Sequence, residues 1–148
     1  MNGAILSVLL AVIGGVLLAV QAPTNAILAK ASGSPIVAAF ISFLVGTLAL
    51  GAAVGATSGK LFTPELRQLP WYAWLGGFYG AFFVAIAAFG APRVGMGVLL
   101  TAAVAGQLAA ALVLDHFGLL GLARQPINIS RGLGFVLVLV GAMLVRRG

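Results

Sequence analysis

The sequence predicts an all-α integral membrane protein, and three observations support this. Of the 148 residues, 62% are hydrophobic and only 7% are charged, whereas a soluble domain carries about a quarter charged residues. The apolar residues gather into five blocks, and a helix of about 20 apolar residues crosses a bilayer. The charged residues fall between these blocks or at their ends. The lipid bilayer is therefore the expected surrounding of this chain.

We expect one domain over residues 1–148, built of five transmembrane helices. The predicted spans are about 3–29, 36–57, 71–90, 94–114 and 132–145. The first block is longer than one perpendicular crossing requires, so we expect it to tilt or to kink at Pro23, which cannot bond the carbonyl of Ala19. The turn Ser32-Gly33-Ser34-Pro35 separates the first span from the second.

Turn residues and interfacial residues also mark the ends of the later spans. The third opens with Pro70-Trp71-Tyr72-Ala73-Trp74, an aromatic cluster typical of a membrane interface, with a proline suited to a helix start. We expect a short turn at Ala91-Pro92-Arg93 before the fourth span, which ends in Asp115-His116-Phe117-Gly118. The fifth span is short and ends at Arg146-Arg147.

The basic residues give a formal net charge of +6, but they form no basic face that could follow nucleic-acid phosphates.

Five spans place the termini on opposite sides of the membrane. Lys60, Arg67, Arg124 and Arg131 then lie on the N-terminal side, and Lys30, Arg93, Arg146 and Arg147 on the other. Because the lysine and arginine bias of short loops sets orientation, this balance predicts insertion in both orientations (dual topology). The alternative is that one local charge or a partner fixes a single orientation.

Short motifs follow one another along nearly the whole chain. They are Gln21-x3-Asn25, Gly33-Ser34-Pro35, Pro70-Trp71-Tyr72-Ala73-Trp74-Leu75-Gly76-Gly77, Ala91-Pro92-Arg93-Val94-Gly95, Ala105-Gly106-Gln107, Leu114-Asp115-His116-Phe117-Gly118 and Arg131-x2-Gly134. In this order they resemble the YdcZ-like branch of the drug/metabolite transporter superfamily, a family of five-span proteins of the bacterial inner membrane. Larger members of the superfamily look like two such halves fused with inverted topology. The resemblance implies a half-transporter that works as an antiparallel homodimer or as a heterodimer with a paralogue.

The fifth span is similar to the glycine heptad of small multidrug-resistance proteins, which serves dimerisation there. Gly134 and Gly141 are seven residues apart, about two helical turns, so both lie on one helix face. The resemblance implies that they form a dimer interface. Those exporters also use a membrane-embedded glutamate in their first span. The first span here has no carboxylate, so their cation antiport mechanism does not carry over.

Amide side chains in apolar spans need partners other than lipid. Gln21 and Asn25 share a helix face, and Gln107 lies deep in the fourth span. We expect these three, with Tyr79 of the third span, to line a substrate cavity. The alternative is that the amides clamp helices together through hydrogen bonds.

Three further side chains are candidates for proton transfer or for contact with a substrate. Asp115 and His116 end the fourth span and could pass protons, since histidine titrates near neutral pH; the alternative is a polar helix end at the interface. Arg93 could contact an anionic substrate or serve as an interfacial anchor.

The remaining composition argues against an enzyme. The chain has one histidine, two acids and no cysteine, so no nucleophile–base pair and no metal site can be drawn from it. We expect no cofactor and no ATP-binding loop. The sequence therefore predicts a secondary transporter, an exporter of small organic metabolites or drugs that acts as a dimer. A passive channel of the same architecture and a non-transporting accessory subunit are the alternatives.

Overall fold

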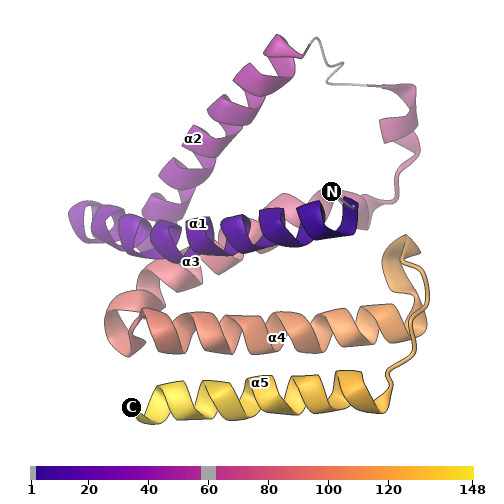
Figure 1. The fold of residues 1–148 in the computed structure, drawn as a ribbon. Helices are drawn as coiled ribbons and strands as arrows, with labels where there is room; N and C mark the ends of the chain where they lie inside the picture. Colours follow the sequence, from indigo (N-terminus) through magenta and orange to yellow (C-terminus); the bar gives the residue numbers. More distant parts are fainter. Residues whose placement is uncertain (1–2, 58–62) are drawn as a thin grey trace. The chain divides into compact units, whose positions relative to one another are not determined.

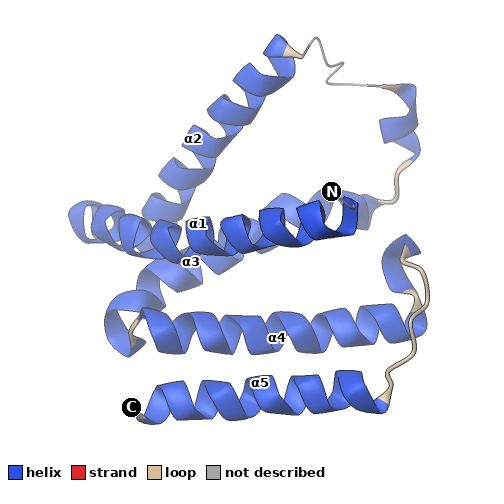
Figure 2. Cartoon of the chain, in the orientation of Figure 1, coloured by secondary structure: helices blue, strands red, loops and turns tan. Residues whose placement is uncertain are grey.

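The computed structural model describes residues 3–57 and 63–148, and within these ranges every regular element is helical (Figures 1 and 2). Five helices are long and apolar enough to cross a membrane. The predicted all-α membrane fold is thus confirmed. Lys60, which enters the charge balance between the two sides, lies outside the described residues. The chain forms two compact units, Met1–Arg93 and Val94–Gly148, which we describe in turn.

The first unit begins with α1 (Gly3–Ser32), which is 30 residues long and contains Pro23. At 1.5 Å per residue it extends about 45 Å, which is more than the roughly 30 Å of a hydrocarbon core. A helix of this length must tilt in the bilayer or project from it. Helical structure continues through Pro23, although the proline leaves the Ala19 carbonyl without its helical partner.

The turn after α1 needs only two residues. Gly33 has a φ of +72°, a left-handed conformation that glycine adopts without steric cost. Ser34 then caps α2 (Pro35–Ala56) by accepting a hydrogen bond from the backbone N–H of Val37, and Pro35 occupies the first helical turn, where a missing N–H is harmless. α1 and α2 meet at this turn and diverge away from it (Figure 1).

The path to the third span contains two 3-10 helices, η1 (Pro64–Gln68) and η2 (Trp71–Leu75), and α3 (Gly76–Val94) follows directly. The sequence predicts a turn at Ala91-Pro92-Arg93, but these residues continue the helix. Proline removes only its own bond to the carbonyl four residues earlier, so one more helical turn is tolerated. The break comes instead at Gly95, where φ is +81°.

The second unit is a helical hairpin. α4 (Met96–Phe117) ends at Gly118, whose left-handed backbone carries bonds from its N–H to the carbonyls of Leu114 and Asp115. A one-turn helix, η3 (Leu119–Gly121), and an extended loop lead to α5 (Ile129–Arg147). The last helix starts at Ile129 rather than at the predicted residue 132, because the Asn128 side chain accepts from the backbone N–H of Arg131 and caps it.

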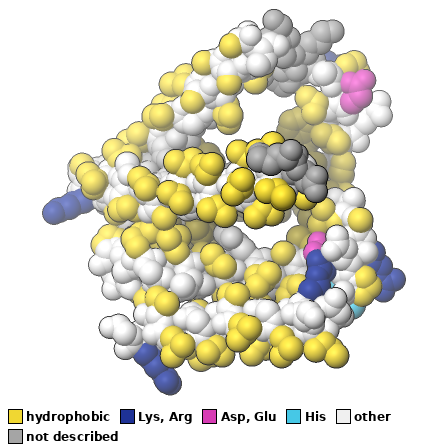
Figure 3. All heavy atoms as spheres, in the orientation of Figure 1, with side chains coloured by type: hydrophobic (Ala, Val, Ile, Leu, Met, Phe, Trp, Pro, Cys, Tyr) yellow, Lys and Arg dark blue, Asp and Glu magenta, His cyan; other side chains and the backbone are white. Residues whose placement is uncertain are grey.

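Small residues make the contacts between the helices. Apart from Asn25, the buried residues of the described ranges are eight alanines and Val84. Ala29, Ala38 and Ala88 form one cluster that joins α1, α2 and α3. Large apolar side chains point outward and are spread over the face drawn in Figure 3, where lysine and arginine lie at helix ends and in loops. This pattern is typical of membrane helices, in which small residues let backbones approach and lipid surrounds the rest.

Candidate substrate site

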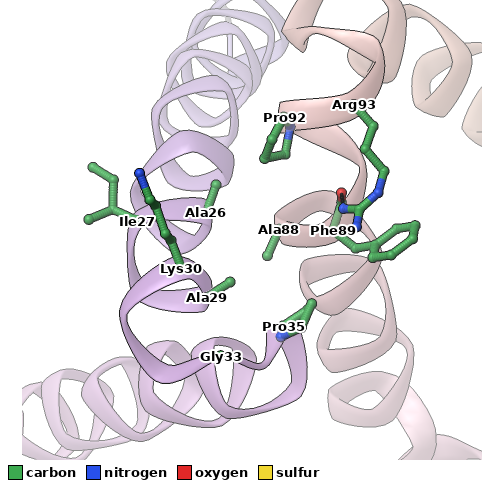
Figure 4. A pocket seen from close by; sticks show the side chains of 10 residues that line it. All are labelled: Ala26, Ile27, Ala29, Lys30, Gly33, Pro35, Ala88, Phe89, Pro92 and Arg93. Carbon is green, nitrogen blue, oxygen red and sulfur yellow. Dashed lines mark hydrogen bonds between the residues drawn. The ribbon is translucent and has the colours of Figure 1, made fainter.

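A pocket in the first unit lies where α1, the α1–α2 turn and α3 come together. Its volume is about 510 Å³, within the range of small-molecule sites. Figure 4 shows Lys30 on the α1 wall and Arg93 on the α3 wall, with apolar side chains between them. The lining residues are Ala26, Ile27, Ala29, Lys30, Gly33, Pro35, Ala88, Phe89, Pro92 and Arg93. We call this the basic pocket.

Arg93 is held in place by its own helix. Its Nη1 donates to the carbonyl of Phe89, and its Cζ lies 3.6 Å from the centre of the Phe89 ring. A guanidinium over an aromatic face gains a cation–π attraction. Arginine carries five N–H donors in a planar fork, so most remain for a ligand. The result is a pre-oriented cation at the mouth of an apolar pocket.

The charge of the basic pocket has no partner on its own unit's helices. The chain contains two acidic side chains, and the single ion pair among the described residues is Arg131–Asp115, in the second unit. The other acid, Glu65, lies in η1, where the Thr63 hydroxyl and then its own backbone lower the pKa of the carboxyl. Lys30 and Arg93 therefore form no ion pair within the described residues.

The four residues expected to line a cavity differ in their surroundings. Asn25 is buried, with 3% of its surface exposed, on the α1 face that also carries Ala22 and Ala29. Gln21 is half-buried one turn earlier, whereas Tyr79 and Gln107 are exposed. None of them lines the basic pocket. Their role in a substrate cavity stays a prediction.

Asp115 and His116 lie together at the end of α4, as expected, and both are engaged by the loop that follows. Asp115 accepts from Arg131 Nη2 at 3.0 Å, and its carbonyl accepts from the Gln125 N–H at 2.7 Å. The Nδ1 of His116 accepts from the Ile127 N–H at 3.1 Å. This arrangement supports the role of a polar helix end, and a proton relay through these residues stays a prediction.

The two glycines of α5 face open space within the chain. A Cβ atom added at Gly134 or at Gly141 would meet no heavy atom within 4 Å. Gly134 also lines a hollow of about 400 Å³ between α4 and α5. A close neighbour for this face would have to come from beyond the hairpin, which is compatible with the predicted dimer interface and does not test it.

In the sequence, Lys30 enters only the charge balance between the two sides, and its place in the basic pocket is not predicted. One signal could have found it. Spans one and three cross the membrane in the same direction, so their C-terminal ends, which carry Lys30 and Arg93, lie on the same side. The chain order alone does not show that α1 and α3 are neighbours. Within the described ranges, no group of three or more metal-ligating side chains is present.

Comparison with protein families gives one match, to a family described as "putative inner membrane exporter, YdcZ", over residues 6–144. A comparison with curated proteins found no match, and neither did a comparison with solved structures.

Proposed function

Because this chain belongs to the YdcZ family of inner-membrane exporters, we propose that it exports small organic metabolites or drugs by secondary transport, as a dimer. At the coarse level it is a multi-pass inner-membrane protein with five helices of membrane-spanning length. The basic pocket is the observation that carries the finer proposal. It offers an open hollow of about 510 Å³, a largely apolar lining and two cations on one unit, which are the elements of a small-molecule site.

A second copy of the chain is proposed as the partner. The buried residues of the described part number only ten, so most of each helix is left to lipid or to another protein. The exposed amide of Gln107 needs a polar partner in a membrane, and a neighbouring copy offers one. An inverted pair would match the repeat architecture of many transporters. An enzymatic activity is not part of the proposal.

Counterflow in proteoliposomes tests the export proposal. Purified protein is first screened for ligands that raise its melting temperature, and a labelled form of the best ligand is then offered to vesicles loaded with unlabelled ligand. A carrier should give saturable uptake that the internal ligand accelerates. Uptake that hardly saturates and shows no counterflow would identify a channel, and the lack of any flux would favour an accessory subunit.

Reporter fusions test the inverted dimer. A C-terminal reporter that is active in the cytoplasm, and a matched one that is active only outside it, should both give signal. Adding lysines to the loops of one side should shift the population to one orientation. A signal from one compartment alone, in cells that lack a paralogue, would rule out dual topology.

A further inference from the structure

The basic pocket is the first of three hollows that share residues along α2 and α3. Pro35 and Phe89 line both the basic pocket and a second hollow of about 380 Å³. Ile36, Phe82 and Ala85 line both the second hollow and a third of about 450 Å³. Shared lining residues place the three hollows next to one another. We call the second and third hollows the aromatic groove.

The aromatic groove is apolar along its whole length. Apart from Ser34 at its start, its lining is entirely hydrophobic, and four phenylalanines beyond Phe89 contribute to it: Phe40, Phe43, Phe78 and Phe82. From Arg93 to Phe78 the path follows fifteen residues of α3, or about 22 Å at 1.5 Å per residue. The groove thus leads from a cationic end into the depth expected for hydrocarbon.

At the far end of the groove, the Phe43 ring of α2 lies against Gly80 of α3. A Cβ atom on Gly80 would lie 3.1 Å from the Phe43 ring, which means that the ring already packs against the α3 backbone. Side chains on both helices, rather than lipid alone, therefore shape the groove.

We propose that the basic pocket and the aromatic groove form one binding site for an amphipathic organic anion, and that this anion is the exported cargo. The inference rests on the export function proposed above and names its substrate class. The acid group binds in the basic pocket, which Lys30 and Arg93 line and which no carboxylate of the described residues neutralises. The apolar body lies against the phenylalanines of the groove, where its removal from water is favourable. Cations are disfavoured, because two like charges stand at the head of the site.

A photo-crosslinking experiment tests the site with a defined probe, an alkyl sulfonate that carries a terminal diazirine. The full-length protein in phosphatidylcholine nanodiscs is irradiated with the probe, and the labelled residues are mapped by mass spectrometry. We expect labelling on the segments that line the aromatic groove. Decanesulfonate should displace the probe, whereas decyltrimethylammonium, which has the same chain and the opposite permanent charge, should not.

Variants that remove one charge distinguish binding at this site from nonspecific partitioning of the probe into the bilayer. Lys30→Gln and Arg93→Gln should each weaken displacement by decanesulfonate about tenfold or more, as expected for the loss of one charge-assisted contact. Lys30→Arg, which keeps the charge, should retain binding, and Arg146→Gln, at the end of α5, serves as the control. Melting temperature and detergent-column size identify variants that fail to fold. Equal displacement by the cation, or unchanged binding in both glutamine variants, would overturn the assignment.

Two further measurements identify the molecule that occupies the site and distinguish a failure of this inference from a failure of the export proposal. If phosphatidylglycerol in the nanodisc displaces the probe and decanesulfonate shows no counterflow, the occupant is a bilayer lipid and the cargo assignment is wrong. If a cationic or neutral cargo from the ligand screen gives counterflow while decanesulfonate neither binds nor moves, export stands and the anion inference fails. Saturable counterflow of decanesulfonate that Arg93→Gln abolishes would support both.

Discussion

The Nη2 of Arg131 donates to the Oδ2 of Asp115 over 3.0 Å and so joins the first turn of α5 to the last turn of α4. Arg131 also donates to Gln125, to its carbonyl at 2.9 Å and to its Oε1 at 2.8 Å. The Gln125 N–H in turn bonds the Asp115 carbonyl. These contacts close the end of the hairpin from which the loop emerges. Both charged side chains keep 30% exposure, so solvent screens part of their attraction.

Replacement of Arg131 tests how much this closure stabilises the hairpin. Arg131→Leu removes three hydrogen bonds and should lower the free energy of unfolding by about 1–2 kcal/mol. Asp115→Asn keeps an acceptor near the guanidinium and should cost less than about 1 kcal/mol. Thermal melting in detergent, followed by circular dichroism, measures both. Arg147→Leu at the end of α5 is the control, and an equal loss in that variant would show that the bonds of Arg131 contribute nothing specific.

Gly118 is required by the geometry of the same loop. Its φ is +64°, and an added Cβ would lie 3.3 Å from both the Arg124 Cβ and the Leu122 carbonyl oxygen. Gly118→Ala should therefore destabilise the hairpin by about 1–2 kcal/mol, the cost of a left-handed backbone with a side chain. Gly132→Ala is the matched control, because a Cβ there meets nothing within 4 Å and alanine favours a helix. A melting temperature unchanged in Gly118→Ala would contradict this account of the turn.

Hydrogen bonding lowers the pKa of Glu65. The Thr63 side-chain hydrogen bond is the largest cause of a pKa below the ordinary value of 4.5, and a backbone bond adds to it. A lowered pKa in the folded state favours folding above the ordinary pKa, and this contribution is lost as the pH falls through the lowered value. Thr63→Val should raise the pKa of Glu65 toward its ordinary value. Because Glu65 is the sole glutamate of the chain, selective carbon-13 labelling gives one carboxyl signal to titrate by NMR, and an unchanged midpoint would refute the role of Thr63.

Substitutions at the α5 glycines can test the dimer interface without disturbing the fold of the single chain. A side chain at Gly134 or Gly141 begins in open space, so Gly134→Leu and Gly141→Leu should leave the fold of the monomer intact. If the heptad is the interface, both variants should lower the crosslinking yield and shift the detergent-column profile toward the monomer, since leucine blocks close backbone approach. Leu137→Met and Val138→Ile, which change little in size, are the controls. Dimers of normal stability in both leucine variants would place the interface elsewhere.

Burial separates Asn25 from the other candidate amides. Leucine at this position adds volume to a face packed with alanines, so Asn25→Leu should cost about 1–3 kcal/mol of stability by overpacking. Gln107→Leu, on an exposed face of α4, should change the stability of the single chain by less than about 0.5 kcal/mol. Asn25→Ala removes the amide without adding volume and suits the transport assay. Loss of counterflow at an unchanged melting temperature would support the cavity role of Asn25, and the reverse result would support a clamp.

The sequence by itself determined the elements that depend on local properties. Mean apolarity over a window of about 20 residues predicts a spanning helix wherever it occurs, and all five spans follow from it. The turn at Gly33-Ser34-Pro35 and the helix end at Gly118 were also evident, because a left-handed glycine, a capping serine and a first-turn proline act within a few residues. Pro92 misled because a proline near a helix end is compatible with either a turn or one more helical turn.

Only the tertiary structure decided which side chains meet. The helices are apolar on nearly all sides, so no hydrophobic stripe in the sequence marks the face that packs. Which residues lie beside Lys30, Arg93 and the groove phenylalanines depends on the rotation of each helix about its axis. In the first unit, contacts among Ala29, Ala38 and Ala88 accompany this rotation. The pairing of Asp115 with Arg131 likewise depends on a loop that brings together residues sixteen positions apart, a distance over which local sequence preferences carry no information.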